Sequence, residues 1–539
     1  MDNTVKASTI KTFTDVHTWT GLGAGLALFI AFYAGAITVF THELDAWDNY
    51  GIAQSEAGDI RQANELLSEV IATQPVAGET IRLNISSPEH PGNHVMWFER
   101  LEDGDFKRHD FHLNEDGTLD TSGNTSELAG FIYALHYNLG IPTDWGLWLL
   151  GVICFIYGIA LVSGVVIFIP NFVKDIFVVR PGKNKKRFWL DTHNIVGVLS
   201  LPWHIMFAWS SALLAIAIFL LAPFQLTVFK DDITSRLAPE LGVVQAPEPS
   251  GIPGAMLTAG ALLDIARLEV PGLEPTQLRV SNVGDSNATV RVIGKTHSEH
   301  MEPYANIVMM ATDGRILSVS QPETASAGAT FYRGLIALHF ASFGGYLTKW
   351  LYFILGLAGA YLFYSGNLLW VESRRKRRSQ QQTPASLFLA RLNSGVCIGC
   401  MAGISAAFLA SRGLADLADR AYFMKGAYYG VFFAAILWSF VRPVATGTRE
   451  LLQACALLTA AIPILDIALL DTTPWSAAAQ GHYELLTVDL MAIVAAACFW
   501  FMAAKLNKRA ISGDPNSVWA AHPTSPHGTE ATVASEGTQ

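Results

Sequence analysis

Charged residues are scarce in this chain. Asp, Glu, Lys and Arg make up only 15% of its 539 residues, whereas 51% are hydrophobic. Soluble domains carry roughly 25% charged residues, so the composition predicts an integral membrane protein with sizeable soluble parts. The formal net charge of −10 indicates that nucleic acid is not a partner.

Cysteine is also scarce, and none lies in a polar segment. All five fall inside apolar runs: Cys154, Cys397, Cys400, Cys455 and Cys498. A disulfide framework is therefore not expected. The Cys397-x-x-Cys400 pair has no nearby His or further Cys, which favours a packing role over a metal or redox site.

A nucleotide-binding loop is missing as well. Gly21-x-Gly23-x-Gly25 lies within an apolar run and follows no strand, so it lacks the geometry that cradles phosphate. We interpret these glycines as small residues that allow close helix packing. Without a flavin or nicotinamide signature, any redox chemistry needs a separate cytoplasmic electron donor or a membrane quinol.

What the chain has is long apolar runs. A bilayer span takes about 20 apolar residues, and eight runs qualify: 17–42, 144–170, 190–221, 346–371, 387–411, 423–441, 450–470 and 488–505. Basic clusters follow the second, fourth and eighth, at 183–187, 374–378 and 505–509. The positive-inside rule makes that side cytoplasmic. We therefore predict a multi-pass membrane protein with both termini in the cytoplasm.

Histidine motifs repeat along the chain. Asp15-x-His17 and Asp191-x-His193 each open an apolar run, and the second follows the first by 176 residues. Leu135-His136 and Leu338-His339 each precede a further apolar run, 203 residues apart. Such self-similarity indicates an internal duplication. Each copy reads as a membrane helix, an external segment and a second membrane helix, both in the same orientation.

The two external segments, 43–128 and 222–330, share one pattern. Each has a stretch of helical periodicity, at 60–73 and 255–269, followed by short β-like runs. Each then has an acidic-Gly turn, Asp116-Gly117 or Asp313-Gly314, which is typical of a hairpin. We expect two periplasmic α+β domains.

The chain thus divides into nine parts. They are 1–42, membrane helix 1; 43–128, periplasmic domain 1; 129–175, a short periplasmic helix and membrane helix 2; 187–221, membrane helix 3; 222–330, periplasmic domain 2; 331–372, a short periplasmic helix and membrane helix 4; 373–386, a basic cytoplasmic linker; 387–509, a four-helix membrane extension; and 510–539, a disordered cytoplasmic tail.

These motifs together resemble the PepSY-associated transmembrane family, which includes inner-membrane ferrisiderophore reductases of the ferrioxamine type. The resemblance rests on the Asp-x-His starts, the paired external segments and the Leu-His motifs, and it covers about residues 10–375. It implies a haem-containing protein that reduces a ferric siderophore on the periplasmic side. It implies nothing about the last four spans.

Haem held by two histidines needs two neutral imidazoles that approach from opposite sides. The repeat supplies such pairs: His17 with His193 near the cytoplasmic face, and His136 with His339 near the periplasmic face. We therefore expect two haems b. The alternative for each histidine is a hydrogen-bonded residue at a helix end.

His204 breaks this symmetry. It follows His193 by 11 residues, which on a straight helix places it close to the same face and about 16 Å deeper. His204 can be interpreted as a haem ligand or relay, or as a core histidine beside a kink at Pro202. A ligand role would need His136 or His339 as its partner. His42, His297 and His300 read as helix-end and loop residues.

The leading functional hypothesis is a transmembrane oxidoreductase that reduces a periplasmic ferric siderophore and releases Fe(II). The alternatives are a membrane transporter or permease, and a periplasmic sensing module of an iron-uptake system. Parallel repeats occur in transporters. The few charges at mid-depth and the lack of an evident broken helix pair count against that class.

Overall fold

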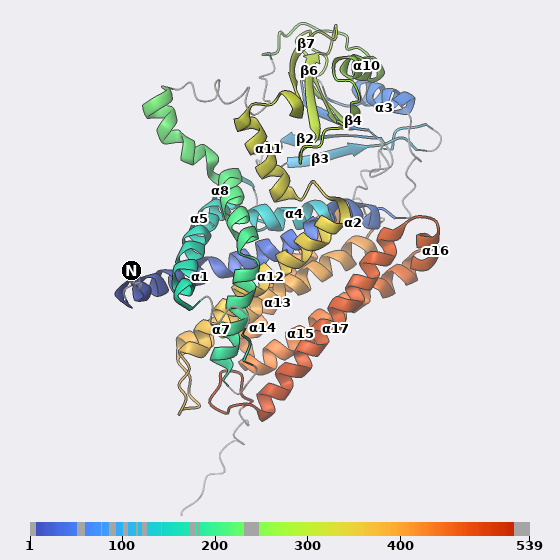
Figure 1. Cartoon of the computed structure of the whole chain (residues 1–539). Coiled ribbons are helices and arrows are strands. Elements are labelled where there is room, and N and C mark those ends of the chain that lie inside the picture. Colours follow the sequence, from blue (N-terminus) through green and yellow to red (C-terminus); the bar gives the residue numbers. More distant parts are fainter. Residues whose placement is uncertain are drawn as a thin grey trace, which may run out of the picture.

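The structure is a computed structural model of the chain. It describes residues 7–50, 60–76, 78–85, 93–100, 106–114, 117–120, 127–141, 143–171, 178–180, 184–230, 247–415, 417 and 419–521. A helical bundle lies below a domain built on a β-sheet (Figure 1). The tail after Ala521 and the loops between these ranges lie outside the described residues.

Seven helices are long and apolar enough to cross a membrane. They are α1 (Ala7–Thr38), α5 (Thr143–Phe168), α12 (Gly345–Ser373), α13 (Pro384–Gly413), α14 (Arg420–Val441), α15 (Val444–Leu469) and α17 (Tyr483–Ser512). Four short helices accompany them: α2 (Thr41–Asp48), α4 (Leu128–Asn138), α11 (Ala327–Phe340) and α16 (Pro474–Ala479). The polytopic helical fold predicted from the apolar runs is confirmed.

A bent helix pair also meets the length and apolarity of a membrane span when its two arms are taken together. α7 (Lys185–Leu199) and α8 (Leu201–Phe224) meet at an angle of 70°. Pro202 lies in the first turn of α8, where its ring and missing N–H disfavour continuation of the preceding helix. The span predicted over 190–221 corresponds to this bent pair, so the extrapolation from His193 to His204 along a straight helix does not hold, and the kink at Pro202 that was left open is present. A broken helix pair is present after all.

The two external segments join in one sheet. β1 (Ile81–Asn84), β2 (His94–Arg100) and β3 (Phe106–Phe111) come from the first, and β4 (Glu274–Ser281), β5 (Thr289–Lys295), β6 (Tyr304–Met310) and β7 (Ile316–Ser320) come from the second. The order is β3-β2-β1-β4-β5-β6-β7, and all neighbours for which a register is resolved are antiparallel. The segments expected to form two domains therefore share one sheet.

One core lies between this sheet and two helices. α3 (Ile60–Thr73) and α10 (Ala259–Glu269) pack on the same face, and the Asn64 side chain accepts the Gly260 N–H at 2.8 Å. Alternate residues of the strands, among them Leu83, Leu278 and Val292, are fully buried against them. The alternation of apolar and polar residues along the strands produces this one-sided core.

The last four spans are joined to the rest by buried charges near the sheet end of the bundle. Arg412 of α13 donates to Asp466 of α15 at 2.7 Å, and Asp466 also accepts from the Trp47 indole of α2. Arg420 lies 2.7 Å from the Asp48 carboxylate. All of these side chains are almost fully buried.

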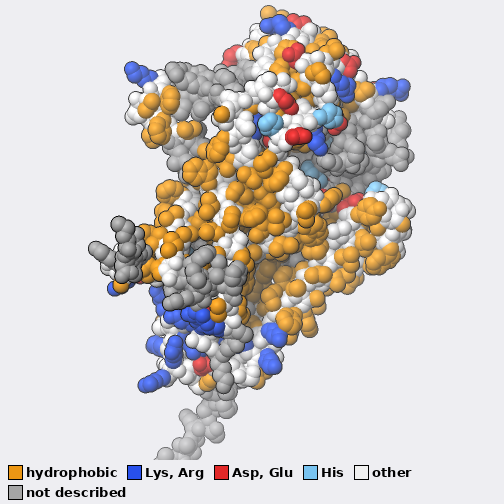
Figure 2. Space-filling model, viewed as in Figure 1, with side chains coloured by type: hydrophobic (Ala, Val, Ile, Leu, Met, Phe, Trp, Pro, Cys, Tyr) orange, Lys and Arg blue, Asp and Glu red, His pale blue; other side chains and the backbone are white. Residues whose placement is uncertain are grey.

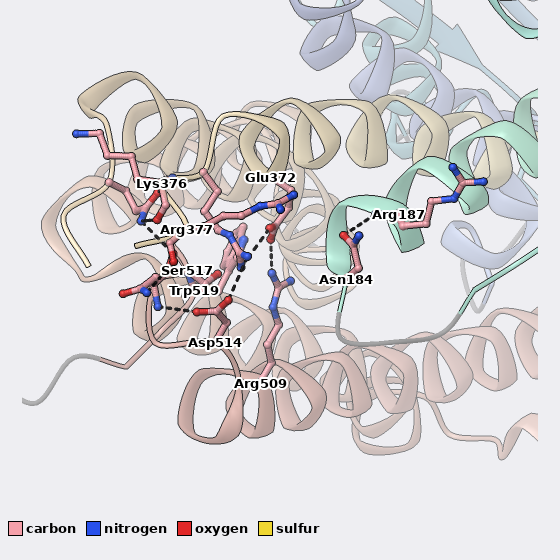
Figure 3. Close-up of polar contacts among 12 residues, drawn as sticks. Asn184, Arg187, Glu372, Lys376, Arg377, Arg509, Asp514, Ser517 and Trp519 are labelled. Atoms are coloured by element: carbon pink, nitrogen blue, oxygen red, sulfur yellow. Dashed lines mark hydrogen bonds and ion pairs between the residues drawn. The ribbon is translucent and has the colours of Figure 1, made fainter. Parts of the chain in front are cut away.

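Basic residues gather at the opposite end of the bundle (Figure 2). Figure 3 shows how they connect α12 to the end of α17: Glu372 accepts from Arg509, and Arg375 lies 3.1 Å from Asp514. Asn184 caps α7 by accepting the Arg187 N–H. We call this the basic end and the opposite end the sheet end.

The turn that Asp285 holds in the sheet domain is expected to lose stability at acid pH. Its carboxylate accepts hydrogen bonds from the backbone N–H groups of Ser250, Gly251 and Asn287, and these lower the pKa of Asp285 to about 2. An acid with a lowered pKa stabilises the fold above its unfolded value and loses that contribution as the pH falls through the folded value. Hydrogen exchange at Ser250 and Gly251, corrected for intrinsic rates, should accelerate between pH 4 and pH 2. In Asp285→Asn the exchange at Ser250 and Gly251 should be fast over the whole pH range. Exchange that responds neither to pH nor to the substitution would show that Asp285 does not stabilise this turn.

Candidate functional site

Two of the predicted histidine partners face each other at the sheet end of the bundle. The ring centroids of His136 on α4 and His339 on α11 lie 6.1 Å apart. The Nδ1 of His136 lies 2.8 Å from the Ala31 carbonyl oxygen of α1. The Nδ1 of His339 lies 2.7 Å from the Ser210 hydroxyl of α8. Four helices therefore orient this pair.

The other predicted pair forms in the same way toward the basic end. The ring centroids of His17 on α1 and His193 on α7 lie 6.3 Å apart. The Nδ1 of His17 lies 2.8 Å from the Ala160 carbonyl oxygen, and the Nδ1 of His193 lies 3.3 Å from the Ser365 hydroxyl. Each pair takes one histidine from the part of the chain before residue 180 and one from the part after it.

The geometry of both pairs suits iron held between two imidazoles. With Nδ1 engaged by a carbonyl or hydroxyl, Nε2 is the nitrogen left for a metal. Metal–imidazole bonds of about 2 Å on either side place ring centroids roughly 6 Å apart. Among the described residues no group of three or more His, Cys, Asp or Glu gathers as a metal site. Two opposed ligands fit a metal whose other positions a macrocycle fills.

Glycines make room for three of these rings. A Cβ added at Gly35 would lie 2.5 Å from the His136 Nδ1, and one at Gly164 would lie 3.0 Å from the His17 ring. One at Gly366 would lie 3.3 Å from the His193 ring. A larger residue at Gly35 would require the His136 ring to shift, whereas at Gly164 and Gly366 the ring would have to give by only a few tenths of an ångström.

Ser163-Gly164 and Ser365-Gly366 are functional residues that sequence reasoning missed. Ser163 lies 3.5 Å from the His17 Nδ1 and Ser365 takes the matching place beside His193. The two dipeptides stand 202 residues apart, close to the spacing of His136 and His339. Their repetition was the signal that could have revealed them.

Both imidazoles at the sheet end are held neutral. α4 and α11 lie outside the candidate spans. Burial lowers the pKa of His136, while the hydrogen bond to Ala31 opposes this. Burial, followed by the neighbouring His136, lowers the pKa of His339 to about 3. Metal ligation needs a neutral imidazole, so both rings are ready to bind at physiological pH.

His204 is not paired with either predicted partner. It is 1% exposed, its Nδ1 is hydrogen-bonded to the Tyr157 hydroxyl, and its Nε2 has no partner among the described residues. Its ring lies 5.8 Å from that of Phe32, which contacts Phe207, and Phe207 lies 5.8 Å from His339. A relay position between the two pairs fits this better than ligation opposite His136 or His339.

A cavity of about 2560 Å³ reaches the sheet-end pair. His136, His339 and Phe207 line it, together with residues of α1, α12, α13 and α17. On the sheet side it is lined by His300, in the loop between β5 and β6, and by Tyr304, the first residue of β6. The cavity therefore extends from this histidine pair to the sheet domain.

The histidines of the sheet domain have partners of their own. His109 lies 2.8 Å from Glu99 and stacks on Trp97, and His112 lies 3.1 Å from Asp120. His94 is hydrogen-bonded to Asn84. His42, expected at the end of the first span, lies in α2, and His90 lies outside the described residues. No metal role is indicated for those that the structure describes.

Comparison with known proteins places most of the chain in one family. The family model for the PepSY-associated TM region matches residues 14–373, which end at the last residue of α12. An uncharacterised protein of Pseudomonas aeruginosa is 29% identical over 331 residues, which cover 57% of this chain and 77% of that protein. α13 to α17 lie beyond the matched region. This polytopic membrane protein therefore belongs to the PepSY-associated transmembrane family.

Proposed function

We propose that the protein is a haem-containing oxidoreductase of the bacterial inner membrane that reduces a ferric siderophore on the periplasmic side. The observation that carries this proposal is the two opposed histidine pairs, with ring centroids 6.1 Å and 6.3 Å apart and every Nδ1 engaged by a carbonyl or hydroxyl oxygen. Histidines packed together by chance would not be expected to form two pairs with nearly the same centroid separation.

The chain would hold haem b at each pair, and a bound haem supplies a centre that carries one electron. His17 and His193 would hold one group, and His136 and His339 the other. The residues between them, Phe32, His204 and Phe207, fill the interior with rings in contact. A cytoplasmic donor or a membrane quinol would supply the electrons, because the chain has no flavin or nicotinamide signature.

A ferric chelate is the substrate that suits the sheet end. Siderophores bind Fe(III) through hard oxygen ligands and hold Fe(II) poorly, so transfer of one electron releases the metal. The cavity beside His136 and His339 opens toward the sheet domain, where a chelate could approach without entering the membrane. In this proposal the ferric chelate binds at the sheet domain before it is reduced.

The basic residues support the orientation. Lys185, Arg375 and Arg509 mark the basic end, which the positive-inside rule assigns to the cytoplasm. The sheet domain then lies in the periplasm, and both termini lie in the cytoplasm.

The bent pair α7–α8 favours a transporter as the second candidate. Discontinuous helices often line substrate sites in transporters. Here the bend separates His193 from His204, and both arms carry residues of the histidine array, which accords better with electron transfer.

A dithionite-reduced minus oxidised visible spectrum tests the proposal, with the haem content measured per chain. Sharp b-type bands and about two haems per chain are expected. The absence of haem from protein made with ample haem supply would refute the reductase and leave the transporter.

The glycine beside His136 gives a sharper test of the sheet-end site. Gly35→Ala would bring a Cβ to 2.5 Å from the His136 Nδ1, so the ring must move and its group should be lost or altered in spectrum. Gly23→Ala in the same helix meets nothing within 4 Å and serves as the control. Helix propensity favours both changes by about 1 kcal/mol. Equal spectra for the two variants would show that the ring is not held as described.

A further inference from the structure

The sheet has one face without helices, and arginines meet on it. α3 and α10 cover the face that carries Leu83 and Leu278. Arg82 and Arg279 point to the other side, because side chains alternate along a strand. They stand directly opposite each other in the register of β1 and β4, and Arg279 stands opposite Arg291 of β5. We call this the arginine face.

The arginines come from both halves of the chain and lie at the centre of the sheet. β4 is the middle strand of the seven, and the Arg82–Arg279 pair sits where the two halves meet. Like charges directly opposite on neighbouring strands destabilise a sheet. The charges that act on Arg279 are those of Arg82 and Arg291, and burial together with these charges lowers the pKa of Arg279. The row is thus a local excess of positive charge.

The arginine face looks toward the helix that carries His339. Ser320 of β7 lies on this face, opposite Asn306, and accepts a hydrogen bond from Arg333 of α11 at 2.7 Å. His339 follows Arg333 by six residues, a rise of about 9 Å along the helix. Figure 1 shows α11 descending from the sheet to the bundle. The arginine face is therefore joined at β7 to the helix that carries His339.

We propose that the arginine face binds the substrate as a negatively charged ferric chelate, with its anionic groups against Arg82 and Arg279. This rests on the proposed function and adds the charge class of the substrate. Arginine forks match carboxylate oxygens in geometry and charge. A neutral or cationic chelate would gain nothing from three adjacent guanidinium groups.

Binding of a redox-inert complex tests the site apart from any electron transfer. The probe is the gallium(III)–EDTA anion, measured by calorimetry on the purified full chain, with neutral gallium(III) tris(acetohydroxamate) for comparison. Arg82→Gln and Arg279→Gln should each weaken binding of the anion roughly five- to tenfold. Binding should also fall as salt rises. The neutral complex should bind weakly to all forms.

Arg61→Gln is the matched control, because Arg61 lies on α3 behind the covered face and its side chain is 81% exposed. It should leave binding unchanged. Removal of one arginine relieves like-charge repulsion but also ends the contact of Arg279 with Gln277 or of Arg82 with the Phe98 ring, so thermal melting of both test variants checks that they remain folded. Unchanged binding in both test variants, or an equal loss in Arg61→Gln, would overturn the arginine site.

The two proposals fail separately. Haem-containing, active protein that binds the anion no better than the neutral complex would end the inference and leave the reductase. Arginine-dependent binding by protein that takes up no haem would keep the anion site and end the reductase.

Discussion

His136→Ala is expected to remove about half of the low-spin b-type haem signal and to leave the other half unchanged. His136 and His339 face each other alone, with ring centroids 6.1 Å apart, so loss of either leaves no opposed pair at the sheet end. His339→Ala should give the same spectrum, and the double variant should be no worse than either single one. Residues that act as one unit give such non-additive effects.

Substitutions in the pair at the basic end test the second haem site separately. His17→Ala should remove the remaining signal when combined with His136→Ala, because His17 and His193 form a separate pair. His204→Ala should retain both haems, since the His204 ring faces no other histidine ring within contact distance among the described residues. Haem content per chain and redox difference spectra measure all of these. A full two haems in His136→Ala would place the sheet-end ligands elsewhere.

Arg412→Ala is expected to destabilise the protein by roughly 3–5 kcal/mol, the usual result of removing one partner of a buried ion pair. Arg412 is 5% exposed and donates to Asp466 and to the Trp47 carbonyl, so its loss leaves the fully buried Asp466 carboxylate without its cation. Asp489, which is also buried, lies beside Asp466 and within the influence of Arg412. Loss of Arg412 would leave these two acidic side chains together without a cation, which should raise the cost.

Thermal unfolding in detergent, followed by tryptophan fluorescence, measures this effect. Arg442→Ala removes a comparable contact, 2.7 Å to Glu450, from a partly exposed position and should cost no more than about 1 kcal/mol. Asp466→Asn in the Arg412→Ala background should recover part of the loss, because it removes the stranded charge. Equal melting temperatures for the two arginine variants would show that the buried network contributes little.

Much of the membrane architecture could be predicted because apolar length is a local property of the sequence. The runs that begin near Trp145, Gly345 and Pro384 were located within a few residues of the helices observed. The repeated Asp-x-His and Leu-His motifs also identified which histidines meet. A repeat places matched residues at matched depth, so His17 with His193 and His136 with His339 needed no further information.

Features that depend on distant partners could not be found in this way. The pairing of β1 with β4 joins residues almost 200 positions apart, such as Arg82 and Arg279, and alternation along a strand does not say which edge it meets. The 70° bend at α7–α8 required more than Pro202, since proline is also tolerated in a first helical turn. The contact of Arg412 with Asp466 joins residues that are 54 positions apart in the sequence, and no local pattern predicts it.

Because both external segments contribute to one sheet, a chain with only one such segment would need a partner. Each half supplies one histidine to each pair, and the two halves meet where β1 pairs with β4. A polypeptide with a single copy would expose an unpaired strand edge and hold no complete pair. Only a symmetric homodimer, with identical edges paired across its two-fold axis, would restore both. The covalent link between the two halves makes that partnership permanent.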